Sequence, residues 1–180
     1  MRVIVGIDPG LANCGFAVVA CGATRTVLDI GTIHTTKDSA QWTHDVPARV
    51  YEIRNAVSVL CGRYQATELA IEAWVYVGGR SLNASAALST SRLIQSIEDM
   101  CRDSKIDTQE YAAVAVRQRV AGRKDADDAM MRLWLPRYVL DCPDLAKVSC
   151  HAVDALAIAV CHSMSLKART QLPLTVLSLW

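Results

Sequence analysis

The fold of this chain is decided by an apolar segment near its start, Val3-Ile4-Val5-Gly6-Ile7-Asp8-Pro9-Gly10. Its β-branched residues favour a strand, and the Pro-Gly pair ends that strand directly after a carboxylate. Two further apolar runs follow over residues 15–20 and 27–36. Because turn residues separate these three runs, we expect them to form an antiparallel meander.

The later part of the chain changes its hydrophobic period. Apolar residues spaced by three or four predict a helix that begins near Asp45 and ends near Gly62. A buried strand is expected at residues 68–72 and a fifth strand at 109–113, with further helices over 81–101, 125–136 and 150–164. A meander followed by alternating strands and helices predicts an α/β fold, with a mixed five-stranded sheet flanked by helices.

Length and composition restrict the class of protein. The chain has 180 residues, of which 52% are hydrophobic, and its formal charge is +1. This predicts one domain over residues 1–165 and a C-terminal tail over 166–180. Its seven cysteines are odd in number and include no CxxC pair, which disfavours a disulfide framework or a zinc ribbon. With no secretory or membrane-spanning segment, we expect a cytoplasmic protein with no membrane partner.

Two carboxylates stand at the ends of predicted strands. Asp8 ends the first strand and Glu72 ends another, so they would emerge together if those strands are neighbours. Asp8 before Pro-Gly also suits a simple turn former. Glu72 is flanked by apolar residues, and a buried carboxylate of that kind must be paired, protonated or bound to a metal.

The last predicted helix adds a polar pair to an otherwise apolar surface. His151 and Asp154 are three residues apart and therefore project from one face. Together with Asp8 and Glu72 they favour a site for hard divalent cations, Mg²⁺ or Mn²⁺, over an isolated core histidine. Two such ions would neutralise the three carboxylates and one bridging phosphate, and they can activate water and stabilise the leaving oxygen in phosphodiester cleavage.

Residues 117–124 form a basic stretch with four cations, Arg117, Arg119, Arg123 and Lys124. A solvated loop is the ordinary interpretation of such a stretch, whereas beside a phosphodiester-cleaving site it predicts contacts to the DNA backbone. The loop after Glu72 carries Trp74, Tyr76 and Arg80. The two aromatic residues suit either a core or a wedge against unstacked bases.

Three segments in order resemble the RuvC-type Holliday junction resolvases. They are the first strand through Leu11, Leu69-Ala70-Ile71-Glu72 with the following Asn83–Leu88, and His151–Ala159. The resemblance covers about the first 162 positions. It implies an RNase H-like fold, a homodimer, a divalent metal and symmetrical nicking of four-way DNA junctions.

Carried over by position, the resemblance implies a catalytic set of Asp8, Glu72, His151 and Asp154, the same four residues that would hold the metal. Many relatives have Asp where this chain has His151, which bears on metal preference. Arg117 and Lys124 fall where the family has basic residues close to the scissile phosphate, so Lys124 joins the expected catalytic residues. The family's junction-probing aromatic aligns near Val75, so Trp74 and Tyr76 are both candidates to replace it.

Other functions fit parts of the pattern. Gly6–Gly10 is similar to the first phosphate loop of actin-type and sugar-kinase ATPases, but those need two lobes and this chain has length for one. We therefore expect no nucleotide cofactor. A nuclease for other branched DNA or RNA substrates, of bacterial or bacteriophage origin, and a non-catalytic junction-binding protein also remain open.

Overall fold

The computed structural model describes residues 1–37, 42–73 and 84–171. Its strands are β1 (Arg2–Asp8), β2 (Asn13–Cys21), β3 (Arg25–His34), β4 (Glu68–Glu72) and β5 (Asp107–Tyr111). Its helices are α1 (Trp42–Tyr64), α2 (Ala84–Asp103), α3 (Ala113–Ala121), α4 (Asp128–Trp134) and α5 (Cys150–Gln171), with short 3₁₀ turns at Leu135–Arg137 and Leu145–Lys147.

The five strands form one mixed sheet in the order β3-β2-β1-β4-β5. The first three strands make the predicted antiparallel meander, whereas β4 and β5 run parallel to β1. The crossovers through α1 and α2 account for this change of direction, because parallel neighbours need a long connection. The predicted fold class, a mixed five-stranded sheet flanked by helices, is confirmed.

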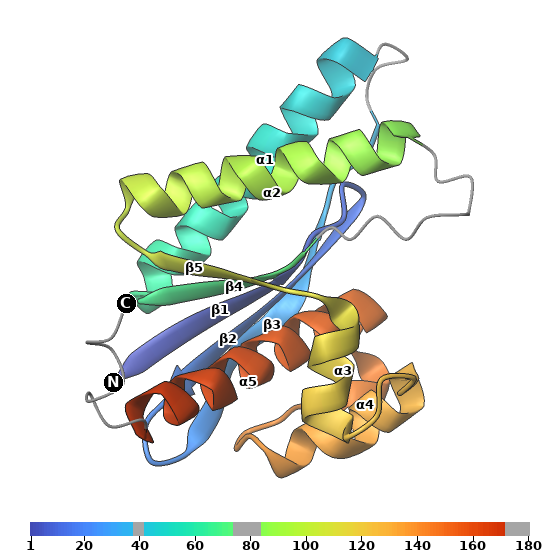
Figure 1. Cartoon of the computed structure of the whole chain (residues 1–180). Coiled ribbons are helices and arrows are strands. Elements are labelled where there is room, and N and C mark those ends of the chain that lie inside the picture. Colours follow the sequence, from blue (N-terminus) through green and yellow to red (C-terminus); the bar gives the residue numbers. More distant parts are fainter. Residues whose placement is uncertain (38–41, 74–83, 172–180) are drawn as a thin grey trace, which may run out of the picture.

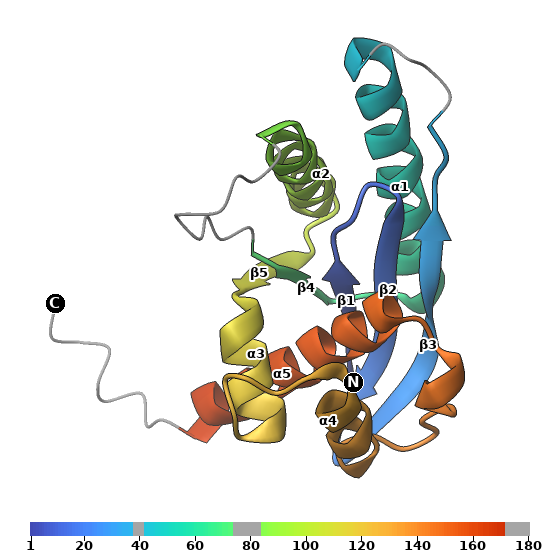
Figure 2. The ribbon, with the colours of Figure 1, turned by 90° about the vertical axis from the view of Figure 1, so that its right-hand side faces the viewer.

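Helices cover both faces of the sheet (Figures 1 and 2). α1 and α2 lie on one face, and α5 lies on the other together with α3 and α4. A hydrophobic core lies on each face of the sheet, and the side chains of β1 alternate between the two. Val3, Val5 and Ile7 pack in the core under α1 and α2, while Ile4 packs in the core under α5. A strand with apolar residues on both faces reads as a continuous apolar run, as the sequence does here.

Two glycines let α5 lie directly on the sheet. A Cβ atom added at Gly15 would lie 2.0 Å from the carbonyl oxygen of His151, and one at Gly6 would lie 2.2 Å from that of Ala155. Any side chain at these positions would push the helix away. The close approach therefore fixes where the first turn of α5 meets the ends of β1 and β2.

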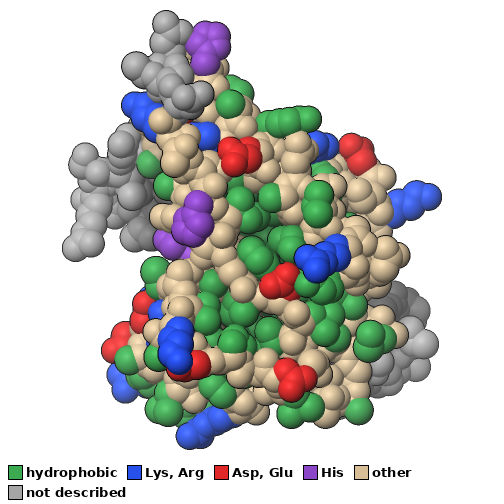
Figure 3. All heavy atoms as spheres, turned by 180° about the vertical axis from the view of Figure 1, so that it is seen from behind, with side chains coloured by type: hydrophobic (Ala, Val, Ile, Leu, Met, Phe, Trp, Pro, Cys, Tyr) green, Lys and Arg blue, Asp and Glu red, His purple; other side chains and the backbone are tan. Residues whose placement is uncertain are grey.

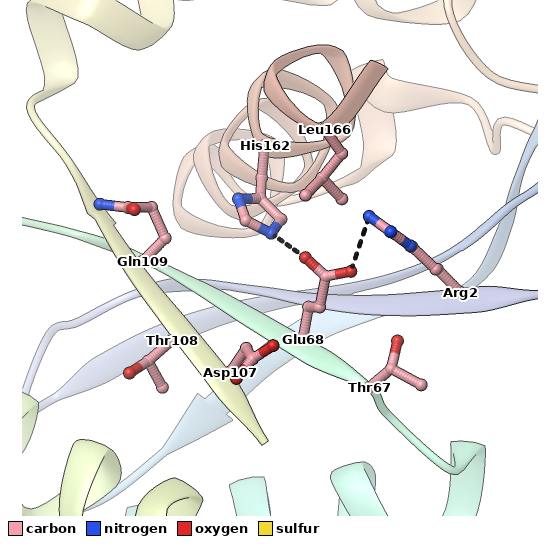
Figure 4. A pocket seen from close by; sticks show the side chains of 8 residues that line it. All are labelled: Arg2, Thr67, Glu68, Asp107, Thr108, Gln109, His162 and Leu166. Atoms are coloured by element: carbon pink, nitrogen blue, oxygen red, sulfur yellow. Dashed lines mark hydrogen bonds and ion pairs between the residues drawn. The ribbon is translucent and has the colours of Figure 1, made fainter. Parts of the chain in front are cut away.

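A polar network connects the later part of α5 to the sheet (Figure 4). Nε2 of His162 on α5 donates to Oε2 of Glu68 at 2.7 Å, and its Nδ1 lies 2.8 Å from the hydroxyl of Tyr111. Arg2 pairs with the other Glu68 oxygen at 3.4 Å. Both imidazole nitrogens are thus occupied, and the network ties α5 to β1, β4 and β5.

Element boundaries differ from the sequence prediction on both sides of the sheet. The third strand, expected over residues 27–36, spans Arg25–His34 because it pairs with β2 in that register. The fifth strand begins and ends two residues earlier than expected, because it pairs with β4 in the register Glu68↔Asp107. The basic stretch is not one loop: Arg117 and Arg119 lie in α3, which ends at Gly122 in a left-handed conformation. Tertiary pairing and this glycine cap set these limits, and hydrophobic periodicity does not reveal either.

Two helices also differ in extent. The helix expected from Asp125 begins at Asp128, where the side chain of Asp127 caps it by accepting from the backbone of Met130. α5 continues beyond the expected end near Met164 to Gln171. The division into a domain over 1–165 and a tail over 166–180 stays a prediction. Ser81, where the helix over 81–101 is expected to begin, lies outside the described residues.

Candidate active site

Strand register places Asp8 and Glu72 side by side. Because β1 and β4 pair in parallel with Ile7 opposite Ile71, the next residue of each strand is the acidic one. Asp8 alternates in phase with Ile4, and Glu72 in phase with Ala70, both of which pack into the core under α5. Both carboxylates therefore leave the sheet on the α5 side.

The first turns of α5 complete the group. Nδ1 of His151 donates to Oδ2 of Asp8 at 2.7 Å. Because a carboxylate only accepts, the proton of a neutral His151 lies on Nδ1 and its Nε2 keeps a lone pair. Among the described residues, Nε2 of His151 has no hydrogen-bond partner. This is the orientation in which a histidine ligates a metal.

Burial and mutual repulsion raise the pKa values of the acidic residues in this group. Burial, followed by the charges of Asp8 and Asp154, raises the pKa of Glu72 to about 7. Burial, then the charges of Asp8 and Asp128, raises the pKa of Asp154 to about 6. Burial also raises the pKa of Asp8, although the hydrogen bond from His151 opposes it. A positive charge placed between these carboxylates would lower their pKa values and stabilise their charged forms.

A pocket of about 330 Å³ contains the whole group. It is lined by Asp8, Glu72, His151 and Asp154, by Arg117 from α3 and by Asp128 from α4, among others. Arg117 lowers the pKa of both Glu72 and Asp154 by its charge. One guanidinium, four carboxylates and an imidazole thus share a pocket at the ends of parallel strands, where ligands bind in such sheets.

The oxygen and nitrogen donors of Asp8, Glu72, Asp154 and His151 are of the types that divalent cations bind. Within residues 1–37, 42–73 and 84–171, no three His, Cys, Asp or Glu side chains converge at coordination distance on a single point. Repulsion opposes closer convergence of the carboxylates when no cation lies between them. Mg²⁺ requires only one or two protein carboxylates and takes its other ligands from water and substrate phosphate, so such spacing suits it.

The four basic residues over 117–124 lie in different surroundings. Arg117 lines the acidic pocket, whereas Arg119 and Lys124 line a neighbouring hollow between α3, β5 and α5. Arg123 is engaged with Asp125 at 2.8 Å. The structure therefore does not bring Lys124 into the pocket, and its expected place among the catalytic residues has no support from this geometry.

Charge is dispersed on the face of the molecule that Figure 3 shows. In Figure 3, which views the molecule from behind, Lys and Arg side chains are scattered singly between acidic and hydrophobic ones. Trp74, Tyr76 and Arg80 lie outside the described residues.

Sequence reasoning missed Asp128. The helix expected from Asp125 makes it an interior residue, whereas it is the first residue of α4 and lines the acidic pocket. The signal that could have found it is the Asp127-Asp128 pair, since an N-cap acid followed by a first-turn acid marks a helix start.

The five-stranded sheet and its flanking helices define an RNase H-like fold, with the acidic pocket at the ends of β1 and β4. The family model described as crossover junction endodeoxyribonuclease RuvC matches residues 4–162. The chain therefore belongs to the RuvC family of crossover junction endodeoxyribonucleases, which confirms the resemblance seen in the sequence.

Individual relatives agree with this assignment. The RuvC of Photobacterium profundum is 33% identical over 164 residues, covering 91% of this chain and 87% of the relative. Among solved structures, Thermus thermophilus RuvC in complex with Holliday junction substrate matches with a TM-score of 0.79 and 23% identity, covering 94% and 98% of the two chains. The yeast mitochondrial Holliday junction resolvase Ydc2 matches with a TM-score of 0.66 and 15% identity, covering 92% of this chain and 80% of the other. No described helix is long and apolar enough to cross a membrane.

Proposed function

We propose that this chain is an endonuclease that resolves four-way DNA junctions by metal-dependent phosphodiester hydrolysis. The observation that carries the proposal is the pocket in which Asp8, Glu72, His151 and Asp154 meet Arg117. Membership of the RuvC family supports it, as does the likeness to a RuvC structure that contains a Holliday junction substrate.

Three carboxylates and the free Nε2 of His151 would hold the cations, two Mg²⁺ or Mn²⁺ ions in each site. When bound, divalent cations supply an activated water and stabilise the leaving oxygen. Asp8 orients the imidazole of His151 through the 2.7 Å hydrogen bond. Arg117 offsets part of the negative charge that Glu72 and Asp154 would otherwise present to a phosphate.

Further cations would position the DNA backbone. Arg119 and Lys124 share a hollow next to the acidic pocket, on the other side of α3. Phosphate contacts of this kind fix the register of the duplex without reading sequence. Arg123 contributes less, because Asp125 already neutralises it.

Paired nicks in a junction require two active sites, and one chain supplies one, so we propose a homodimer. α2 is the candidate interface. It buries Leu93, Ile97 and Cys101 against the sheet, while Leu88 on its outer side is 48% exposed. We further propose that the dimer acts in the cytoplasm, where bacterial or bacteriophage DNA is found.

The decisive experiment incubates the purified protein with labelled four-way junction, flap and linear duplex DNA, each with Mg²⁺, Mn²⁺ or chelator. We expect paired nicks in the junction that require the metal and are lost in Asp154→Asn. Preferred cleavage of flaps would indicate a broader branched-DNA nuclease. Junction binding with no cleavage under any metal would contradict the proposal and indicate a non-catalytic binding protein.

A further inference from the structure

The acidic pocket contains one carboxylate that the proposed function does not use. Asp128 stands at the first position of α4 and lines the same pocket as Asp154. Its neighbour Asp127 has a structural task, because its Oδ1 accepts from the backbone N–H of Met130 at 2.9 Å and caps the helix. The carboxylate of Asp128 takes part in no hydrogen bond or ion pair within the described part of the chain.

Asp128 also acts on Asp154 through space. Its negative charge is one of the causes that raise the pKa of Asp154, after burial and the charge of Asp8. Arg117 from α3 is the cation that lowers the pKa of both Asp154 and Glu72. One guanidinium therefore faces four carboxylates in this pocket, and the side chains alone leave an excess of negative charge there.

An unpaired carboxylate at this position conflicts with phosphate binding unless a cation intervenes. A DNA phosphate entering the pocket would be repelled by Asp128 as well as by the residues already assigned to the metal. A divalent cation changes the sign of that interaction, because cation-bound water donates hydrogen bonds to carboxylates. Asp128 is solvent-exposed and comes from a separate element, which suits contact through water.

We propose that Asp128 is a fifth cation-binding residue of this site, holding the ion next to Asp154 through cation-bound water. The inference rests on the proposed function, since it assumes that Asp8, Glu72, His151 and Asp154 bind divalent cations. It adds a consequence of its own: Asp128 weakens the metal-free protein's attraction for DNA and strengthens the loaded protein's hold on its ions. Junction binding is thereby coupled to the presence of the metal.

The competing explanation is that Asp128 serves only α4. Acidic residues in the first turn of a helix interact favourably with its dipole. Asp127 provides the matched control, since it lies next to Asp128, carries the same charge, caps the same helix and does not line the pocket. Asp127→Ser removes this charge and keeps a good N-cap side chain.

The test is a titration of the full chain with Mn²⁺, in which the free ion is measured by electron paramagnetic resonance without DNA. We expect Asp128→Asn to weaken Mn²⁺ binding about 10-fold, the scale typical for residues that act around a metal's direct ligands. Asp128→Glu should restore part of the affinity, and Asp127→Ser should leave it within about 2-fold of the parent protein. Circular dichroism confirms folding, and Asp128→Ser replaces the asparagine variant if that one does not fold.

Junction binding in chelator supplies a second readout. Asp128→Asn should bind the junction more tightly than the parent protein without metal, and the difference should shrink or reverse with Mn²⁺. Equal Mn²⁺ affinity of the Asp128→Asn and Asp127→Ser proteins would overturn the inference while leaving the proposed function intact. If the parent protein binds no Mn²⁺ and Asp154→Asn changes nothing, the proposed metal site itself is refuted.

Discussion

The imidazole of His151 and the carboxylate of Asp8 share a 2.7 Å hydrogen bond although 143 positions separate them in the chain. The bond joins the first turn of α5 to the end of the central strand, and it leaves the lone pair on Nε2 of His151. Imidazole is a softer ligand than carboxylate and suits later first-row ions better than Mg²⁺.

The first prediction therefore concerns metal preference. Mn²⁺ should support at least as much junction cleavage as Mg²⁺, and His151→Asp should shift the preference toward Mg²⁺. Initial cleavage rates over a range of each metal measure this. A His151→Ala protein with the parent rate and the parent metal preference would show that the site rests on carboxylates alone.

The second prediction concerns pH and the stability of the metal-free protein. The pKa of Glu72 is raised from 4.5 to about 7, mainly by burial. As the pH rises from about 4.5 through 7, the unfolded chain loses this proton before the folded chain does, so the free energy of unfolding falls. Below about pH 4.5, where Glu72 is protonated in both states, the free energy of unfolding is not reduced.

Glu72→Gln removes the ionisable group and with it this loss of stability at high pH. At pH 8 in chelator, the variant should be more stable than the parent protein by about 1–2 kcal/mol, a figure reduced for solvent screening of a half-buried group. At pH 4.5 the two should be nearly equal. Urea denaturation at both pH values measures the difference, and Mn²⁺ should stabilise the parent protein more than the variant. An equal gap at both pH values would contradict the assigned cause.

The third prediction separates the cations of residues 117–124. Arg117→Gln and Lys124→Gln should each reduce the slope of log binding constant against log salt by about one unit, as expected for one lost phosphate contact. Arg123→Gln should change the slope less, because Arg123 already pairs with Asp125 at 2.8 Å. Only Arg117→Gln should also slow cleavage strongly, since Arg117 alone of these lines the acidic pocket. Three identical slopes at the parent value would mean that these residues do not touch DNA.

The fourth prediction concerns the Glu68–His162 network. Both residues are buried, Glu68 with 8% and His162 with 5% of its surface exposed, so removing one partner leaves the other unsatisfied. His162→Ala should destabilise the fold by about 2–4 kcal/mol. In a double-mutant cycle with Glu68→Gln, the two losses should fall well short of additive. Additive losses would show that the pair does not act as a unit.

The fifth prediction concerns assembly. Leu88→Glu on the outer side of α2 should convert the dimer to a monomer and abolish paired nicking, because each monomer retains only one site. Sedimentation velocity follows the mass, and circular dichroism checks the fold. Paired nicking by a proven monomer would refute the need for a dimer.

The sequence alone determined the architecture and most of the site. Apolar alternation in Val3–Ile7 and the i, i+3 spacing of His151 and Asp154 depend on local geometry, which a pattern of residue types expresses directly. The same local logic identified Asp8 and Glu72, because each carboxylate interrupts an apolar strand at its end. Three motifs in order then sufficed to identify the family.

Only the tertiary structure decided how these residues are used. The parallel register of β1 and β4 made Asp8 and Glu72 neighbours, and Gly15 allowed α5 to bring His151 within hydrogen-bond distance of Asp8. The start of α4 brought Asp128 into the pocket, while α3 separated Arg117 from Lys124. These outcomes depend on strand pairing, on close packing at glycine and on where helices end, and contacts between distant segments set all three.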